Sequence, residues 1–182
     1  MLDSIFDFIG ADSGEWKVAS TSTFKGSPLP SVSHLTKIAS NLVPTASGIW
    51  TLKGIVSNLR YTEKEEKDKL VSMQEDLGRP NATFAAFIPI RKSEAWWNLA
   101  QDERRKIMEN KSQHTYTGMK YLPAIARKLF HSRDIGEPFD FLTWFEYAPE
   151  HLDDFEELLF ALRKTEEWTY IDREIDIRLE KM

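Results

Sequence analysis

The sequence predicts an α+β fold, in which strands and amphipathic helices follow one another along the chain. In residues 171–179, isoleucine and leucine alternate with charged side chains, which is the pattern of a strand with one buried face. Residues 82–90 form an apolar run with the length of a buried strand. Between residues 62 and 80, a capping sequence and a glycine–proline stop enclose a helical repeat. These three patterns predict mixed secondary structure.

The composition is that of a globular protein and excludes several kinds of site. The chain has 182 residues, enough for one large domain or two small fused ones. Its net charge of −5 argues against nucleic acid or an anionic membrane as the main partner. The absence of cysteine excludes disulfides, thiolate metal sites, iron–sulfur clusters and covalently attached haem. Metal ligands must come from Met, Tyr, carboxylates or the four histidines, which are His34, His114, His131 and His151.

The N-terminus has none of the features of a signal peptide. Asp3 and Asp7 lie within the first 14 residues, and no basic residue accompanies them. No apolar run approaches the length of a membrane span. We therefore expect a cytoplasmic protein with no membrane segment.

The first 61 residues predict one short helix and two strands. Residues 2–10 have the apolar spacing of an amphipathic helix, and residues 15–26 alternate as a strand does. Residues 26–45 are rich in Ser, Pro and Thr, which indicates a loop with one helical turn near residues 35–42. Residues 47–61 predict the second strand.

The helix that follows has clear end signals. Thr62 and Glu65 form a capping box, and Gly78 and Pro80 end the helix. Gln74 lies beside the apolar stripe, which consists of Leu70, Met73 and Leu77.

From residue 82 onward, the predicted order is β-α-β-β-α-β. The elements are a strand at 82–90 stopped by Pro89, a helix at 93–121 with a break near 99–101, two strands within 121–147, a helix from Pro149, and a strand at 170–180. This order is the ferredoxin-like pattern, and the first 80 residues contain an abbreviated version of it. We expect one sheet with helices on one face, whose second face is covered by a partner subunit or a ligand.

Arg127 lies on an apolar face of a predicted strand. Side chains alternate between the two faces of a strand, so Ile125, Arg127 and Leu129 point the same way. An unpaired guanidinium away from water is costly. Arg127 therefore needs a carboxylate, an anionic ligand or a wet cavity, and a buried structural salt bridge is the plainer alternative.

His114 lies near the end of the long predicted helix. Gly118, four residues later, has no side chain on the same helix face and leaves room beside the imidazole for a flat ligand. The plainer alternative is a partly exposed histidine at a helix end.

Three further groups are weaker candidates. Either Glu166 or Glu167 could accept a proton from an imidazole, although both could equally face solvent. The pair Trp96–Trp97 is typical of a core. Arg173 shares a face with isoleucines, and for it we expect a structural salt bridge.

Residues 83–180 contain segments in a recognisable order. They read FIPIRKSEAWWNL, ERRKIMENKSQH, YLPAIARKLFHSRDIGEPFDFLTWFEY and LRKTEEWTYIDREIDIRL. Together they resemble the chlorite dismutase family of haem b proteins, and the abbreviated N-terminal part is similar to the family's short, dimeric branch. The resemblance implies a homodimeric α+β barrel with an abbreviated N-terminal part at 1–80 and a haem-binding ferredoxin-like domain at 81–182.

The resemblance also implies a role for each candidate residue. His114 would be the proximal ligand of the haem iron, and Glu167 would accept a hydrogen bond from its other ring nitrogen, with Glu166 as the alternative. Arg127 would be the catalytic arginine over the open iron face, with Gln74 as its hydrogen-bond partner. The residues implied near the haem edge and propionates, or packing the pocket, are Lys92, Trp96, Trp97, Asn58 and Tyr61.

The activity implied by the resemblance is the decomposition of chlorite to chloride and dioxygen at ferric iron. One alternative is a related coprohaem decarboxylase, but that branch has a reactive tyrosine where this sequence has Ile88, and a glutamine where this sequence has Arg127. Another alternative is a haem-binding or peroxidase-like protein that does not turn over chlorite physiologically. A ferredoxin-like protein without haem would be colourless.

Overall fold

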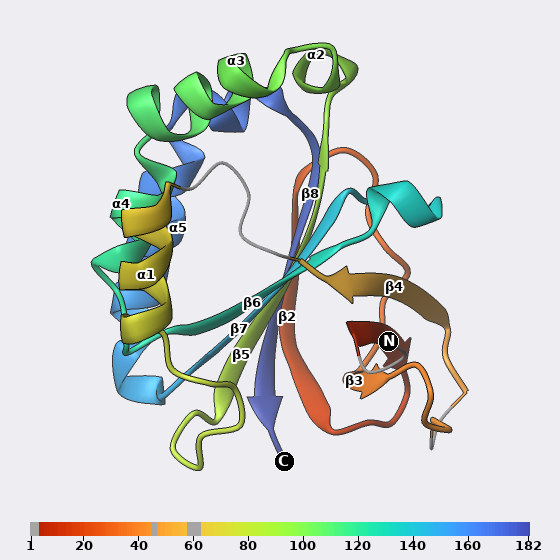
Figure 1. Ribbon diagram of the computed structural model, residues 1–182. Helices are drawn as coiled ribbons and strands as arrows, with labels where there is room; N and C mark the ends of the chain where they lie inside the picture. Colours follow the sequence, from red (N-terminus) through yellow and green to blue (C-terminus); the bar gives the residue numbers. More distant parts are fainter. Residues whose placement is uncertain (1–3, 45–46, 58–62) are drawn as a thin grey trace.

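Eight antiparallel strands form a closed barrel in the computed structural model, which describes residues 4–44, 47–57 and 63–182. The order around the barrel is β1-β3-β2-β8-β5-β7-β6-β4 (Figure 1). The strands are β1 (Ile5–Ala11), β2 (Trp16–Lys25), β3 (His34–Ala39), β4 (Trp50–Val56), β5 (Phe84–Lys92), β6 (Ala126–His131), β7 (Phe141–Tyr147) and β8 (Ile171–Lys181). A mixed fold was predicted, and the structure agrees at that level.

The helices cover one side of the barrel, at the left of Figure 1, and continue over its end at the top. They are α1 (Lys64–Met73), α2 (Glu94–Trp97), α3 (Gln101–Arg105), α4 (His114–Met119) and α5 (Leu152–Arg163), with shorter turns between them. The helix α5 packs its buried face against the outer surface of β5 and β7, where Phe145 and Tyr147 contact Phe155. The outer wall of β5, β6 and β7 is thereby covered by helices.

The barrel interior is filled by large apolar side chains. Phe8 stacks on Phe87 with 4.6 Å between ring centroids, and Phe130 meets Phe8 edge-on. Trp16 and Trp144 complete this interior from other strands. The expectation that a partner subunit or a ligand covers the second face of the sheet is therefore wrong, because that face lines the interior of a closed barrel. The barrel that the family resemblance implied is observed.

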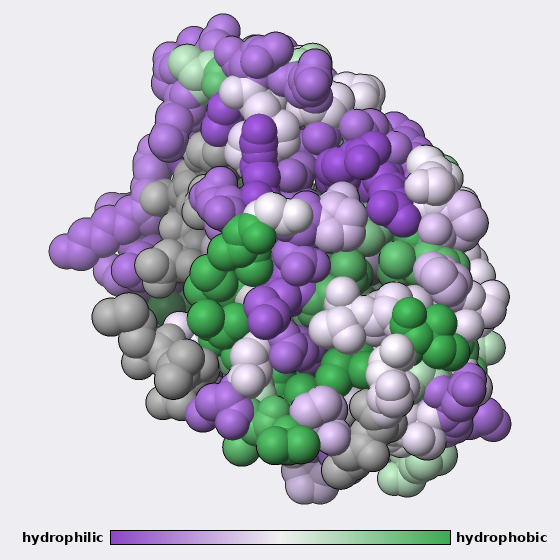
Figure 2. Space-filling view, turned by 90° about the vertical axis from the view of Figure 1, so that its right-hand side faces the viewer, coloured by the Kyte–Doolittle hydropathy of each residue, from purple (hydrophilic) through white to green (hydrophobic). Residues whose placement is uncertain are grey.

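The face away from the helices carries a mixed surface. Hydrophilic and hydrophobic side chains are interspersed on it (Figure 2). This mixture is expected where the apolar faces of the strands point into the barrel. In the part of the chain that the structure describes, no helix is long and apolar enough to cross a membrane.

Two N-terminal predictions are wrong for the same reason. A helix was predicted at residues 2–10, but Ile5–Ala11 form β1. A loop with one helical turn was predicted at residues 26–45, but His34–Ala39 form β3. The strands β1 and β3 pair with each other, and β1 also pairs with β4. Pairing between strands that are distant along the chain outweighs the local pattern.

The predicted helix at 62–78 is shorter than expected. It ends at Met73, and its capping box uses Glu63 and Glu66; Thr62 lies outside the described residues. Gly78 follows the helix with φ of +87°, so a residue that tolerates the left-handed region is needed there. Leu77 packs against the barrel interior instead of continuing a helical stripe.

The second half follows the predicted order, with four corrections. Pro89 does not stop β5, which continues to Lys92. The helix at 93–121 is broken near residue 99 as predicted, but also at residues 112–113, after a π-helical turn at Lys106–Lys111. Leu152, expected in the buried stripe of α5, is 37% exposed. The strand β8 buries both faces, because its carboxylates are paired with arginines of α5 and β8.

Both halves of the chain contribute to the same barrel. The strand β2 pairs with β8, and β4 pairs with β6, so hydrogen-bonded ladders join residues before and after position 80. The division into an abbreviated N-terminal part and a haem-binding ferredoxin-like domain stays a prediction.

Candidate functional site

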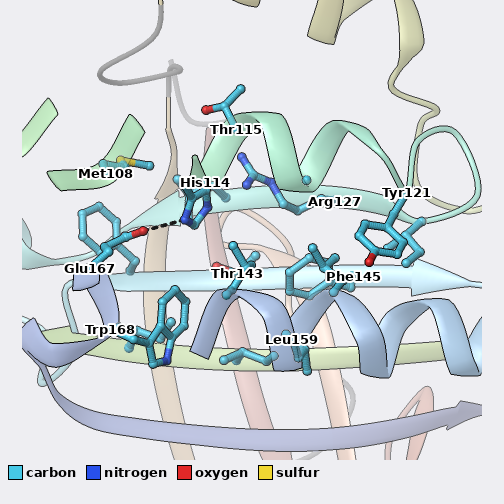
Figure 3. A pocket seen from close by; sticks show the side chains of 18 of the residues that line it. Met108, His114, Thr115, Tyr121, Arg127, Thr143, Phe145, Leu159, Glu167 and Trp168 are labelled. Carbon is cyan, nitrogen blue, oxygen red and sulfur yellow. Dashed lines mark hydrogen bonds and ion pairs between the residues drawn. The ribbon is translucent and has the colours of Figure 1, made fainter. Parts of the chain in front are cut away.

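A cavity lies between the outer wall of the barrel and the helix layer (Figure 3). Its empty volume is about 1400 Å³, part of which is open solvent. Most of its lining is apolar, from β5, β6 and β7 on one side and from α1, α4 and α5 on the other. Such a cavity is suited to a large, flat and mostly apolar ligand with a few polar anchors.

His114 enters the cavity from the first residue of α4. The preceding Gln113 adopts a left-handed conformation with φ of +50°, and this turn separates α4 from the π-helical segment before it. Glu109, on that segment, accepts hydrogen bonds from the Thr115 backbone N–H at 3.2 Å and from its hydroxyl at 2.5 Å. The start of α4 is thus tied to the preceding segment, which fixes the base of the His114 side chain.

Glu167 lies against His114 and is almost completely buried. Its Oε2 is 2.7 Å from His114 Nδ1, and its Oε1 accepts a hydrogen bond of 2.7 Å from Lys92 Nζ. Burial alone would raise the pKa of Glu167, but His114 and Lys92 outweigh burial and lower that pKa to about 2. The Glu167 carboxylate, ionised at neutral pH, accepts a hydrogen bond from Nδ1–H. In the neutral imidazole with its proton on Nδ1, the lone pair is on Nε2.

The two adjacent glutamates have different surroundings. Glu166 is exposed and pairs with Lys111 at 3.0 Å on the surface. Glu167 also binds the chain through its own N–H, which donates to Ser112 Oγ at 3.1 Å. Of the two glutamates that the sequence left open, the geometry brings Glu167 to the imidazole.

The open side of His114 faces the cavity. Among the described residues, no hydrogen-bond partner contacts its Nε2. Trp168 stacks on the imidazole, with 6.3 Å between ring centroids and 18° between planes. Gly118 also lines the cavity, and a Cβ built there would meet no atom within 4 Å, so space is open beside α4 as predicted.

Arg127 reaches the cavity from the opposite element, the barrel wall. It lies on the outer face of β6, as the alternation predicted. Within the described ranges, no carboxylate forms an ion pair with its guanidinium, so the salt-bridge alternative is not observed. Burial lowers the pKa of the Arg127 guanidinium, although the charges of Glu167 and Glu109 act in the opposite direction. An incompletely paired cation at an apolar wall is a site for an anion.

Gln74 reaches Arg127 in a different way from the one expected. Its Nε2 donates to the backbone carbonyl of Arg127, rather than contacting the guanidinium. Both residues line the cavity. This contact ties the end of α1 to β6 at the residue that supplies the cation.

The expected propionate contacts divide into three groups. Lys92 and Trp96 line the cavity, but Lys92 Nζ is bound to Glu167 and lies 3.6 Å from the centroid of the Trp96 ring. Trp97 is not in the lining; its Nε1 donates to Asp140 at 3.1 Å, and Arg133 covers its ring. Asn58 and Tyr61 lie outside the described residues.

The remaining candidates have local partners. His131 and His151 contact Asp134 and Asp154 at 2.8 and 2.9 Å. Arg173 does not use the expected salt bridge, because its guanidinium donates to the carbonyls of residues 27 and 28.

Sequence reasoning missed two residues that shape the site. Trp168 follows Glu167 in the same short turn, and this adjacency was the available signal. Glu109 precedes His114 by five residues. This spacing does not predict a contact with the start of α4 unless the break between the two helical segments is known.

The fold and the cavity define a class: α+β barrels with a buried, histidine-bearing cavity on the outer wall. Comparison with known proteins identifies the family within that class. The family model for chlorite dismutase matches residues 29–180, which is most of the chain. The protein belongs to the chlorite dismutase family.

Three relatives illustrate this membership. The dimeric chlorite dismutase from Nitrobacter winogradskyi has 55% identity, with a TM-score of 0.90 over 97% of this chain and 99% of that one. The chlorite dismutase from Candidatus Nitrospira defluvii, solved in complex with imidazole, has 28% identity and a TM-score of 0.58 over 81% of this chain and 56% of that one. A chlorite dismutase from Ideonella dechloratans is 34% identical over 127 residues, or 66% of this chain, which spans 41% of the relative's length.

Proposed function

We propose that this protein is a haem b enzyme that decomposes chlorite to chloride and dioxygen. The observation that carries the proposal is the pairing of two groups in one cavity. Among the described residues, His114 presents an Nε2 with no hydrogen-bond partner on one side, and Arg127 presents a cation with no carboxylate partner on the other. The relatives from Nitrobacter and Ideonella, both described as chlorite dismutases, support the same reaction.

The residues present fit a haem. An imidazole whose Nδ1 is held by a buried carboxylate is the usual arrangement of a histidine that ligates a metal through Nε2. The apolar lining and the open space at Gly118 suit a porphyrin face. When bound, haem b would supply a ferric iron that acts as a Lewis acid and as a redox centre.

The proximal side of the proposal is a chain of three residues. His114 Nε2 would hold the iron, Glu167 would keep the proton on Nδ1, and Lys92 would keep Glu167 in place. A carboxylate partner makes the imidazole a stronger electron donor, which stabilises the ferric state.

The distal side of the proposal depends on Arg127. Chlorite is a small anion, and the whole protein carries a net charge of −5, so a local cation must attract it. A guanidinium can bind and orient a small oxyanion through parallel N–H donors. Both oxygens of one chlorite leave as one dioxygen while chlorine leaves as chloride, so the reaction requires no external electron donor. Arg127 would keep the anionic species inside the cavity until the O–O bond has formed.

Oxygen evolution tests the proposal directly. Purified, haem-loaded protein receives chlorite in an oxygen electrode, with free haem and the haem-free protein as controls. The proposal predicts rapid release of one dioxygen and one chloride per chlorite. Haem binding without oxygen release would contradict the activity while leaving the cofactor site intact.

The decarboxylase alternative has a structural objection. Ile88 of β5 lines the cavity at the position where that branch has its reactive tyrosine, so no phenol is present there. Should oxygen release fail, coprohaem with peroxide is the next test, and its conversion to haem would establish the alternative.

The assembly and location belong to the same proposal. A homodimer is supported by the Nitrobacter relative, which is described as dimeric and matches nearly the whole chain. The ferredoxin-like description and the cytoplasmic location stay predictions from the sequence.

A further inference from the structure

A buried charge network lies behind the cavity wall, outside the residues used above. Glu174 of β8 is only 1% exposed and accepts a hydrogen bond of 2.8 Å from Trp168 Nε1. The other oxygen of Glu174 accepts a hydrogen bond of 2.8 Å from Arg163 Nε. Arg163 also donates a hydrogen bond of 2.9 Å to Asp176. The network joins α5 to β8, and one of its carboxylates reaches an aromatic ring of the cavity.

Trp168 is the point where this network meets the site. Its indole is nearly buried, lines the cavity and stacks on the His114 imidazole (Figure 3). An indole has a single donor, so the group that accepts from Nε1 decides how the ring is rotated about its side-chain bonds. That acceptor is Glu174, and Arg163 holds Glu174 in turn.

We propose that Glu174 is a positioning residue of the site, which fixes the Trp168 indole against His114 and so shapes the proximal wall of the cavity. The expected effect on bound haem rests on the proposed function. The hydrogen bond between Trp168 and Glu174 does not depend on haem. Glu174 touches neither the cavity nor His114, and it acts only through Trp168.

A simpler reading makes Glu174 a clamp between α5 and β8. The two readings can be separated, because the same network contains a second carboxylate as a control. Asp176 lies two residues away on β8, is 2% exposed and binds the same Arg163 and also Arg178, but makes no contact with Trp168 among the described residues. If the network only clamped α5 to β8, loss of either carboxylate would disturb the site, whereas a positioning role belongs to Glu174 alone.

The test compares Glu174→Gln with Asp176→Asn. A glutamine has only one oxygen, and the charged Arg163 guanidinium is the stronger of the two donors. The oxygen should therefore stay on Arg163, so that the amide NH2 faces Trp168 Nε1 and that hydrogen bond is lost. Indole orientation is measured in haem-free protein by near-ultraviolet circular dichroism, with Trp168→Phe identifying the Trp168 signal. Haem retention is measured as the rate of haem transfer from loaded protein to an apo-globin acceptor.

We expect Glu174→Gln to alter the Trp168 signal and to speed haem transfer about tenfold, the equivalent of about 1.4 kcal/mol. Asp176→Asn should leave both readouts close to the parent. In a Trp168→Phe background, Glu174→Gln should have no further effect on haem transfer, because the residue through which it acts is gone.

Equal effects of the two variants, or an effect of Glu174→Gln that persists in the Trp168→Phe background, would overturn the proposal. If Glu174→Gln does not fold, Glu174→Asp replaces it, because it keeps the charge but withdraws the carboxylate by one methylene. If the parent protein binds no haem, the proposed function fails, and the circular dichroism of the haem-free variants still decides the role of Glu174.

Discussion

The two nitrogen-bearing side chains that line the cavity, His114 and Arg127, differ in how fully the protein supports them. His114 has Glu167 on its Nδ1, Lys92 behind Glu167, and Trp168 against its ring. Arg127 has no carboxylate partner in the described part of the chain, and burial lowers its pKa. A supported histidine is prepared to hold a permanent ligand, whereas an unsupported cation is available for one that comes and goes.

Removal of His114 should have the largest effect. His114→Ala takes away the imidazole of the cavity, and haem affinity should fall by more than about 100-fold, since even residues behind a ligand contribute about 10- to 100-fold. Haem titration followed at the Soret band measures this loss. His131→Ala is the control, because His131 contacts Asp134 away from the cavity lining, and it should bind haem normally.

Loss of the buried carboxylate should cost the folded state several kcal/mol. Glu167→Leu leaves Lys92 buried without its partner, and breaking a buried ion pair on one side costs about 3–5 kcal/mol. Glu166→Leu removes only an exposed pair, worth about 0.5 kcal/mol. Urea unfolding of the two haem-free variants measures the difference in the free energy of unfolding. Equal decreases would mean that Glu167 is not the buried partner of Lys92 and His114.

Acid should weaken the interactions of Glu167 with His114 and Lys92 before it affects Arg127. The pKa of Glu167 is lowered to about 2 in the folded protein, below the value of 4.5 for a free glutamate. A depressed pKa contributes stability above the unfolded value, and this contribution is lost as pH falls from 4.5 towards 2. The contribution is about 3 kcal/mol. Unfolding free energies of the haem-free parent and Glu167→Gln at pH 7 and pH 3 should converge on acidification; a constant gap would contradict this origin.

Replacement of Arg127 should have the smallest effect on stability, and it should stabilise the protein rather than destabilise it. Arg127→Met removes a charge that lacks a carboxylate partner and keeps apolar volume, so the haem-free protein should be more stable by about 1 kcal/mol. Thermal unfolding measures this gain. Lys128→Met, at the neighbouring position of β6, should not change stability measurably, because the Lys128 side chain is exposed. Destabilisation by Arg127→Met would indicate that the guanidinium is a structural group after all.

The contrast also explains what the sequence could predict. Strand alternation was enough to place Arg127 on the same strand face as Leu129, and the order of elements after residue 82 followed from the apolar patterns. The local patterns did not predict the closure of the barrel, which only the family resemblance implied, because β1 and β3 are held by partners distant along the chain. Lys92 was assigned to the haem edge, since nothing local shows that Glu167, 75 residues later, takes its charge.

The central claim is that Arg127, which pairs with no carboxylate in the described part of the chain, holds an anion during the reaction. The most direct test adds chlorite repeatedly to haem-loaded parent, Arg127→Ala and Lys128→Ala proteins, and records the total oxygen released per haem before the Soret band is bleached. The account predicts that Arg127→Ala still evolves oxygen but inactivates after far fewer turnovers, while Lys128→Ala matches the parent. An Arg127→Ala protein that lasts as long as the parent would contradict it.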